Sequence, residues 1–89
     1  IKVDEKILSK YVGEYEITPD FSFLVTLEQD QLYLQGTGQD KIEIFAESET
    51  KFFLKVNDAQ LEFVQGDSGT ITKAILNQGG RTADAKKVK

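Results

Sequence analysis

Apolar side chains recur at every second position over most of this chain, and this period of two is the strongest constraint on its fold. The pattern is clearest over residues 21–27, where Phe21, Phe23, Val25 and Leu27 fall on one side of an extended chain. Similar runs recur at intervals of about 8–12 residues, with turn residues between them, which is typical of short strands. The runs cover residues 13–17, 21–27, 32–36, 41–46, 51–56, 59–64, 70–76 and 81–88.

No helical pattern between these runs is long enough for a parallel crossover, so neighbouring strands are expected to pair antiparallel. An open sheet would expose its edges and leave one apolar face uncovered, and closure removes both problems. We therefore predict an all-β fold, a small antiparallel meander barrel of about eight strands. Ile71, Ala74 and Leu76 fit one face only with a β-bulge near Lys73, and Asn57-Asp58 is typical of a two-residue turn.

A short helix is predicted before the barrel. Ile7, Leu8, Tyr11 and Val12 recur on one face of a 3.6-residue period. Asp4 is suited to the N-cap, and Gly13 is placed to end the helix. We expect one domain over residues 1–89, in which residues 1–12 are a helical lead-in.

The composition excludes several kinds of chemistry. The chain has no Cys and no His, so disulfides, thiolate chemistry, the usual general base and the commonest metal ligand are missing. We expect no catalytic residue, no cofactor and no metal. A net charge of −4 argues against nucleic acid as a partner, and no apolar run approaches the roughly 18 residues that span a bilayer. Because the chain does not open with Met, we expect a module of a longer protein.

Two serine motifs resemble enzyme nucleophile sites but are expected to be turns. Gly66-Asp67-Ser68-Gly69 spells the sequence around the nucleophile of chymotrypsin-like proteases, yet no His is present to take the proton of Ser68. Gly, Asp and Ser are also the residues that a tight connection favours. Ser48 and Lys51 match the S-x-x-K pattern of serine β-lactamases, but they lie in a polar connection rather than on a helix.

The outward side of the strands carries the candidate interaction face. If the strands are neighbours, their outward apolar residues form one patch, and such patches often mark contacts with partners. The alternative is that the N-terminal helix covers this patch with Ile7, Leu8, Tyr11 and Val12. The residues of the candidate face are Leu24, Tyr33, Phe45, Phe53 and Val64.

The inward side is rich in aromatic residues. An eight-stranded barrel is just wide enough to be filled by side chains or to hold one small ligand. So many aromatics favour a filled interior, and Gly36 is the inward residue that makes room. The inward aromatics are Tyr15, Phe21, Phe23, Phe52 and Phe63.

The sequence resembles a known family over nearly its whole length. Tyr11-Val12-Gly13-Glu14-Tyr15, "LYLQGTGQ", "FAESETKFFLKVNDAQLEFV" and "ILNQGGR" are similar to the small domain of unknown function at the C-terminus of bacterial β-lactamase-like serine hydrolases. The resemblance implies a lipocalin-like barrel without catalytic residues, appended to a hydrolase domain. It also implies a bacterial parent protein that is periplasmic or secreted.

Two functions follow from these patterns together with the resemblance. The first is a non-catalytic accessory module that packs against a neighbouring hydrolase domain, or positions substrate for it, through the outward face. The alternative is a lipocalin-like barrel that binds a small hydrophobic ligand. A weak homodimer through the same face is a further alternative.

Overall fold

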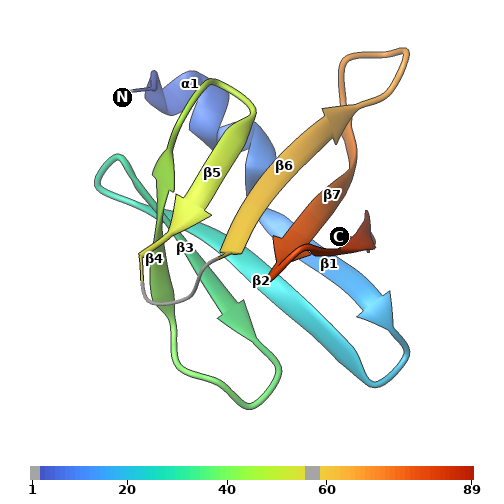
Figure 1. Ribbon diagram of the computed structural model, residues 1–89. Helices are drawn as coiled ribbons and strands as arrows, with labels where there is room; N and C mark the ends of the chain where they lie inside the picture. Colours follow the sequence, from blue (N-terminus) through green and yellow to red (C-terminus); the bar gives the residue numbers. More distant parts are fainter. Residues whose placement is uncertain (1–2, 56–58) are drawn as a thin grey trace.

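The computed structural model describes residues 3–55 and 59–89, which form a closed antiparallel barrel (Figure 1). Each strand pairs with the next along the chain, and β8 pairs with β1 to close the ring. The predicted meander barrel is confirmed. The strands are β1 (Gly13–Thr18), β2 (Phe21–Glu28), β3 (Gln31–Gly36), β4 (Ile42–Ala46), β5 (Lys51–Leu54), β6 (Ala59–Gln65), β7 (Ile71–Gln78) and β8 (Arg81–Lys87).

The predicted bulge lies in β7. Val64 pairs with Lys73, but the next residue of β6, Gln65, pairs with Ile71, so Thr72 is the extra residue. The bulge keeps both Ile71 and Ala74 buried, as the broken alternation required. The turn expected at Asn57-Asp58 lies outside the described residues.

The N-terminal helix is shorter than its sequence pattern suggests. An α-helix, α1 (Glu5–Leu8), continues as a 3₁₀ turn, η1 (Ser9–Tyr11), and the Asp4 carboxylate caps it by accepting from the Lys6 backbone N–H at 2.9 Å. The expectation for Val12 is wrong: this residue is extended and 39% exposed, because the chain already turns toward β1.

The helix lies across one end of the barrel rather than on its outer wall (Figure 1). Val3, Leu8 and Tyr11 are buried in the same core as the inward residues of the strands. The helix therefore closes the barrel end rather than lying on the outward face.

The barrel interior is filled by stacked aromatic rings. Tyr11 stacks on Phe63 with ring centroids 4.1 Å apart, and Tyr15 stacks on Phe23 at 5.3 Å. Phe63 also contacts Phe52 at 5.5 Å and Tyr15 at 5.7 Å, so the rings form one continuous cluster. All five side chains are at most 2% exposed.

Candidate interaction face

The structure brings three of the five candidate residues together on neighbouring strands. Phe45 of β4 pairs directly with Phe53 of β5, and their ring centroids are 5.7 Å apart. Tyr33 of β3 pairs with Glu43, two residues before Phe45 on the same outward side of β4. All three aromatic side chains are half-buried. We call Tyr33, Phe45 and Phe53 the aromatic face.

The other two candidates lie beside different neighbours. Leu24 of β2 is opposite Gln35, diagonal to Tyr33, and is 43% exposed. It lines a separate hollow together with Glu14 and Ser22. Val64 of β6 pairs with Lys73 on another part of the wall. Within the candidate set, Phe45 and Phe53 contact each other, and Tyr33 lines the same hollow as Phe45.

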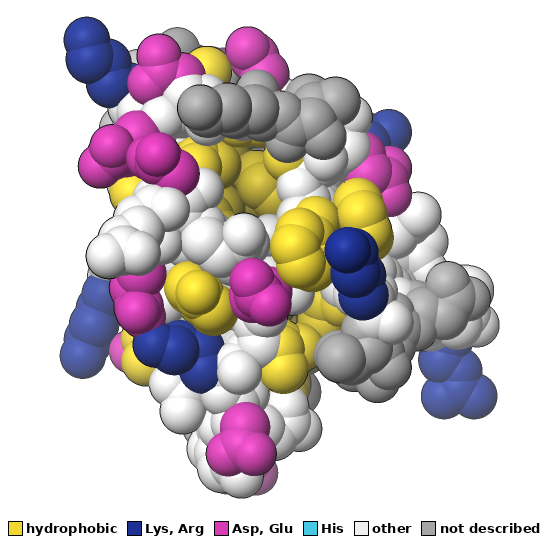
Figure 2. All heavy atoms as spheres, turned by 90° about the vertical axis from the view of Figure 1, so that its left-hand side faces the viewer, with side chains coloured by type: hydrophobic (Ala, Val, Ile, Leu, Met, Phe, Trp, Pro, Cys, Tyr) yellow, Lys and Arg dark blue, Asp and Glu magenta, His cyan; other side chains and the backbone are white. Residues whose placement is uncertain are grey.

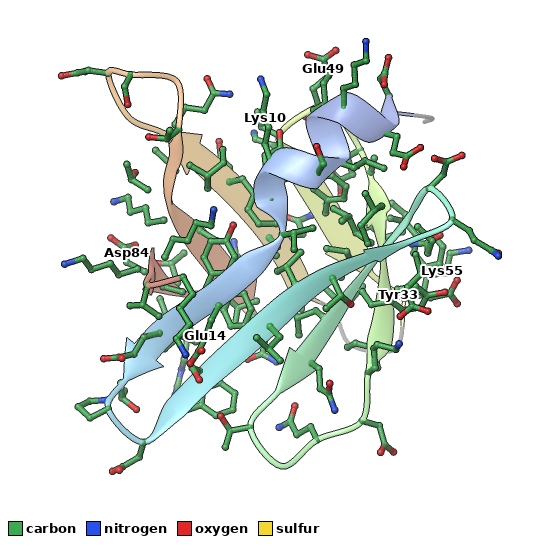
Figure 3. All side chains as sticks on the ribbon, turned by 180° about the vertical axis from the view of Figure 1, so that it is seen from behind. Lys10, Glu14, Tyr33, Glu49, Lys55 and Asp84 are labelled. Carbon is green, nitrogen blue, oxygen red and sulfur yellow. The ribbon has the colours of Figure 1, made fainter. Side chains whose placement is uncertain are left out.

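Two lysines that the sequence did not single out complete the aromatic face. The Lys41 Nζ lies 4.9 Å from the Tyr33 ring centroid, and the Lys55 Nζ lies 4.4 Å from that of Phe45. Both distances are within the range of cation–π contacts. Tyr33 and Lys55 lie close together on the outside of the barrel in Figure 3. With Ile42 and Glu43, these residues line a surface hollow of about 590 Å³.

A groove connects the aromatic face to the N-terminal segment. Its volume is about 410 Å³, and its lining includes Val3 and Leu8 of the N-terminal segment, Phe45 and Phe53 of the aromatic face, and Lys55. Figure 2 looks at this side of the molecule and shows apolar side chains gathered around a hollow, with a basic side chain against them. Val3 and Leu8 thus lie beside the aromatic face.

The interior holds two buried phenols whose hydroxyl groups both donate hydrogen bonds to backbone carbonyl oxygens. The Tyr15 hydroxyl donates to the Tyr11 carbonyl oxygen at 2.8 Å, and the Tyr11 hydroxyl donates to the Glu49 carbonyl oxygen in the β4–β5 turn. Burial raises the pKa of both phenols; the Glu49 charge also acts on Tyr11, and Tyr11 acts on Tyr15. Both groups stay neutral at physiological pH and serve the packing.

Gly36 does not leave an empty space inside the barrel. A Cβ added at Gly36 would lie 2.7 Å from the Gln39 Oε1 and 3.2 Å from the Phe21 Cζ. The space above this glycine is therefore occupied by the side chains of Gln39 and Phe21.

Both serine motifs are turns in the structure. The Gly66 N–H donates to the Thr70 carbonyl oxygen at 2.8 Å across the β6–β7 connection, and Ser68 is exposed with its hydroxyl 3.0 Å from that of Thr70. In the β4–β5 turn, the Ser48 hydroxyl oxygen accepts from the Lys51 backbone N–H at 3.1 Å. Neither hydroxyl meets a general base in these contacts, so the geometry matches the predicted turns.

Over the described ranges, 3–55 and 59–89, no group of three or more acidic side chains could hold a metal ion. No helix of this part of the chain is both long and apolar enough to cross a bilayer.

Comparison with known proteins agrees with the resemblance carried by Tyr11–Tyr15 and the three longer segments. The family model "Domain of unknown function (DUF3471)" matches residues 1–87. The chain is 36% identical over 87 residues to penicillin-binding protein 4* of Bacillus subtilis (strain 168); the match covers 98% of this chain but 19% of that protein, in its C-terminal region. The chain thus spans about a fifth of the length of this relative. The resemblance is confirmed, and the chain belongs to the DUF3471 family of domains of unknown function.

Proposed function

We propose that this domain is a non-catalytic accessory module that packs against a serine hydrolase domain of the same chain, or positions substrate for it. The contact would use Tyr33, Phe45 and Phe53. The observation that carries the proposal is the groove of about 410 Å³ that joins the aromatic face to the N-terminal segment. Kinship with a penicillin-binding protein about five times longer than this chain supports a neighbouring domain.

The position of the face favours an N-terminal neighbour. The relative is matched in its C-terminal region, so most of its chain precedes the matching part. A domain joined before Val3 would be tethered next to Phe45 and Phe53, because Val3 lines the same groove. Tethering raises the effective concentration of the two surfaces, so even a small contact would be populated.

The aromatic face has the composition of a contact surface. Aromatic side chains are enriched at the cores of protein interfaces, where they fill pockets and exclude water. Phe45 and Phe53 are only half-buried although their rings contact each other, so a partner would remove further apolar surface from water.

The alternative of a small hydrophobic ligand inside the barrel has less support. Five aromatic rings occupy the interior, and the space above Gly36 is filled by Phe21 and Gln39. A ligand pocket of the usual size, about 300–1,000 Å³, placed among these rings would require the aromatic cluster to separate.

The proposal also extends to the parent protein. We expect an exported bacterial parent, periplasmic or secreted, on the strength of kinship with a bacterial penicillin-binding protein. Fractionation of the native host with antibodies against this domain tests the expectation, and recovery in the cytoplasm would contradict it.

The docking proposal is tested with the full-length parent chain by scanning calorimetry. If the domains dock, the barrel unfolds together with the hydrolase domain or at a raised temperature. Tyr33→Ser combined with Phe53→Ser should separate the transitions, because it removes two interface aromatics. Val64→Ser is the matched control, since Val64 is also a half-buried outward apolar residue but lies beside Lys73.

Two results would count against this use of the aromatic face. One is a double variant whose isolated 89-residue domain no longer folds, which would assign Tyr33 and Phe53 to the stability of the barrel. The other is an unchanged calorimetric trace in the full chain. A dimer of the isolated domain in light scattering that is lost in the double variant would assign the face to self-association.

A further inference from the structure

We propose that the partner surface places a carboxylate against the Lys55 ammonium, so that Lys55 determines which surface the aromatic face accepts. This inference rests on the proposed docking and names the chemistry of its partner. It starts from the contact of the Lys55 Nζ with the Phe45 ring, 4.4 Å from the centroid. Any surface that covers Phe45 also covers this cation.

Lys55 differs from Lys41 in its charge partners. Lys41 forms an ion pair with Glu28, whereas Lys55 has no ion pair with the residues that the structure describes. Docking over Phe45 would withdraw the Lys55 ammonium from water. A buried charge without a counter-charge is costly, and a charge-assisted hydrogen bond to a carboxylate offsets this cost.

The remaining charges near the aromatic face fix where that carboxylate lies. Glu43 is exposed, two residues before Phe45 on the outward side of β4, and lines the same hollow as Lys55. Asp30 lies at the groove. A partner carboxylate near Glu43 or Asp30 would be repelled, while one over Lys55 is attracted. The charges on the face are therefore asymmetric: a partner carboxylate is favoured over Lys55 and disfavoured near Glu43 and Asp30.

The occupant that fits this charge asymmetry is an element of the preceding hydrolase domain that presents an apolar side chain next to an Asp or Glu. The apolar side chain would lie on Phe45 and Phe53, and its acidic neighbour would reach Lys55. The tether beside Val3 and the length of the relative point to the same chain as the source.

A zero-length carbodiimide cross-link in the full-length parent tests the inference, because it joins a lysine only to a carboxylate in direct contact. Peptide mapping should find Lys55 joined to an Asp or Glu of the hydrolase portion. In calorimetry, Lys55→Glu should lower the barrel's unfolding temperature in the full chain by roughly 5 °C. Lys55→Arg should preserve it, because Arg keeps both the charge and the stacking. Arg81→Glu is the charge-matched control, since Arg81 is exposed at the start of β8.

The outcomes separate the two proposals. If the aromatic double variant uncouples the domains but Lys55 forms no cross-link and Lys55→Glu has no effect, docking stands and the carboxylate is refuted. If the double variant has no effect either, docking itself fails. A cross-link from Lys55 to a second copy of this chain would overturn the intrachain partner in favour of a dimer.

Discussion

Phe63→Ala tests most directly whether the barrel is filled or hollow. Phe63 is 2% exposed and is the ring on which the interior cluster converges. Truncating a buried Phe to Ala costs about 3–5 kcal/mol. The contacts with Tyr11 at 4.1 Å, Phe52 at 5.5 Å and Tyr15 at 5.7 Å contribute about 0.5–1.5 kcal/mol each beyond burial, partly overlapping with that figure. We expect a loss of about 5 kcal/mol.

That loss is large for a domain of this size. A chain of 89 residues has a free energy of unfolding of roughly 4–13 kcal/mol. Urea denaturation followed by circular dichroism measures the difference between the wild-type and variant domains. Phe63→Leu keeps most of the volume but loses the ring contacts, so it should cost about 2 kcal/mol and remain measurable if the Ala variant is unfolded.

Native mass spectrometry completes the test. The wild-type domain should show its bare mass, because the aromatic cluster occupies the interior of its barrel. A cost of less than about 2 kcal/mol for Phe63→Ala would refute the reasoning, since it would mean that Phe63 does not fill the barrel. A wild-type domain that retains a non-covalent mass of a few hundred daltons would refute it as well and would favour the ligand-binding alternative.

Three further predictions concern single residues. Gly13→Ala should destabilise the domain in urea by about 2 kcal/mol or more, because its Cβ would lie 2.3 Å from the Lys89 carbonyl oxygen. Gly69→Ala is the control: Gly69 has φ +83° but open space around it, so this change should cost about 1 kcal/mol. Equal losses in the two variants would contradict the clash at Gly13. Burial raises the pKa of Tyr15 above the unfolded value of 10.0, so above pH 10 the unfolded state loses the phenol proton more readily than the folded state. The contribution of Tyr15 to the free energy of unfolding is therefore complete below pH 10 and is lost as pH rises through the alkaline range. Tyr15→Phe should therefore flatten the fall of the urea midpoint between about pH 10 and 11.5, and an unchanged slope would exclude Tyr15 as its source. Ser68→Ala should change the stability by less than about 0.5 kcal/mol, and loss of a measured hydrolase activity of the isolated domain would show that this serine is catalytic after all.

The fold was predictable because its main signals are local. Alternation such as Phe21 to Leu27 specifies strands, and antiparallel neighbours need only short turns. Even the bulge could be placed within one residue, since Ile71 and Ala74 cannot share a face without an extra residue. The helix was less predictable. Tyr11 is buried by a stack on Phe63, more than 50 residues later, and no helical period encodes that contact.

The extent of the aromatic face depends on strand register, which alternation does not specify. Phe45 and Phe53 meet because they pair directly, whereas Val64 lies opposite Lys73. The lysines were missed for a related reason: Lys55 reaches Phe45 across a strand pair, and a single Lys in sequence carries no signal for such a contact.

The seam between β1 and β8 has a consequence for how the barrel assembles. It pairs Tyr15 with Lys87 and Glu16 with Lys86, so it joins the first and last strands of the barrel. The other strand pairs join strands that are neighbours in the sequence. Joining strands about 70 residues apart costs roughly 4 kcal/mol of chain entropy, which hairpin formation largely avoids. The barrel should therefore close at the β1–β8 pair last during folding, after the hairpins have formed. Lasting protection of the β1 and β8 amides from exchange with solvent then depends on Tyr15 being held in the aromatic cluster.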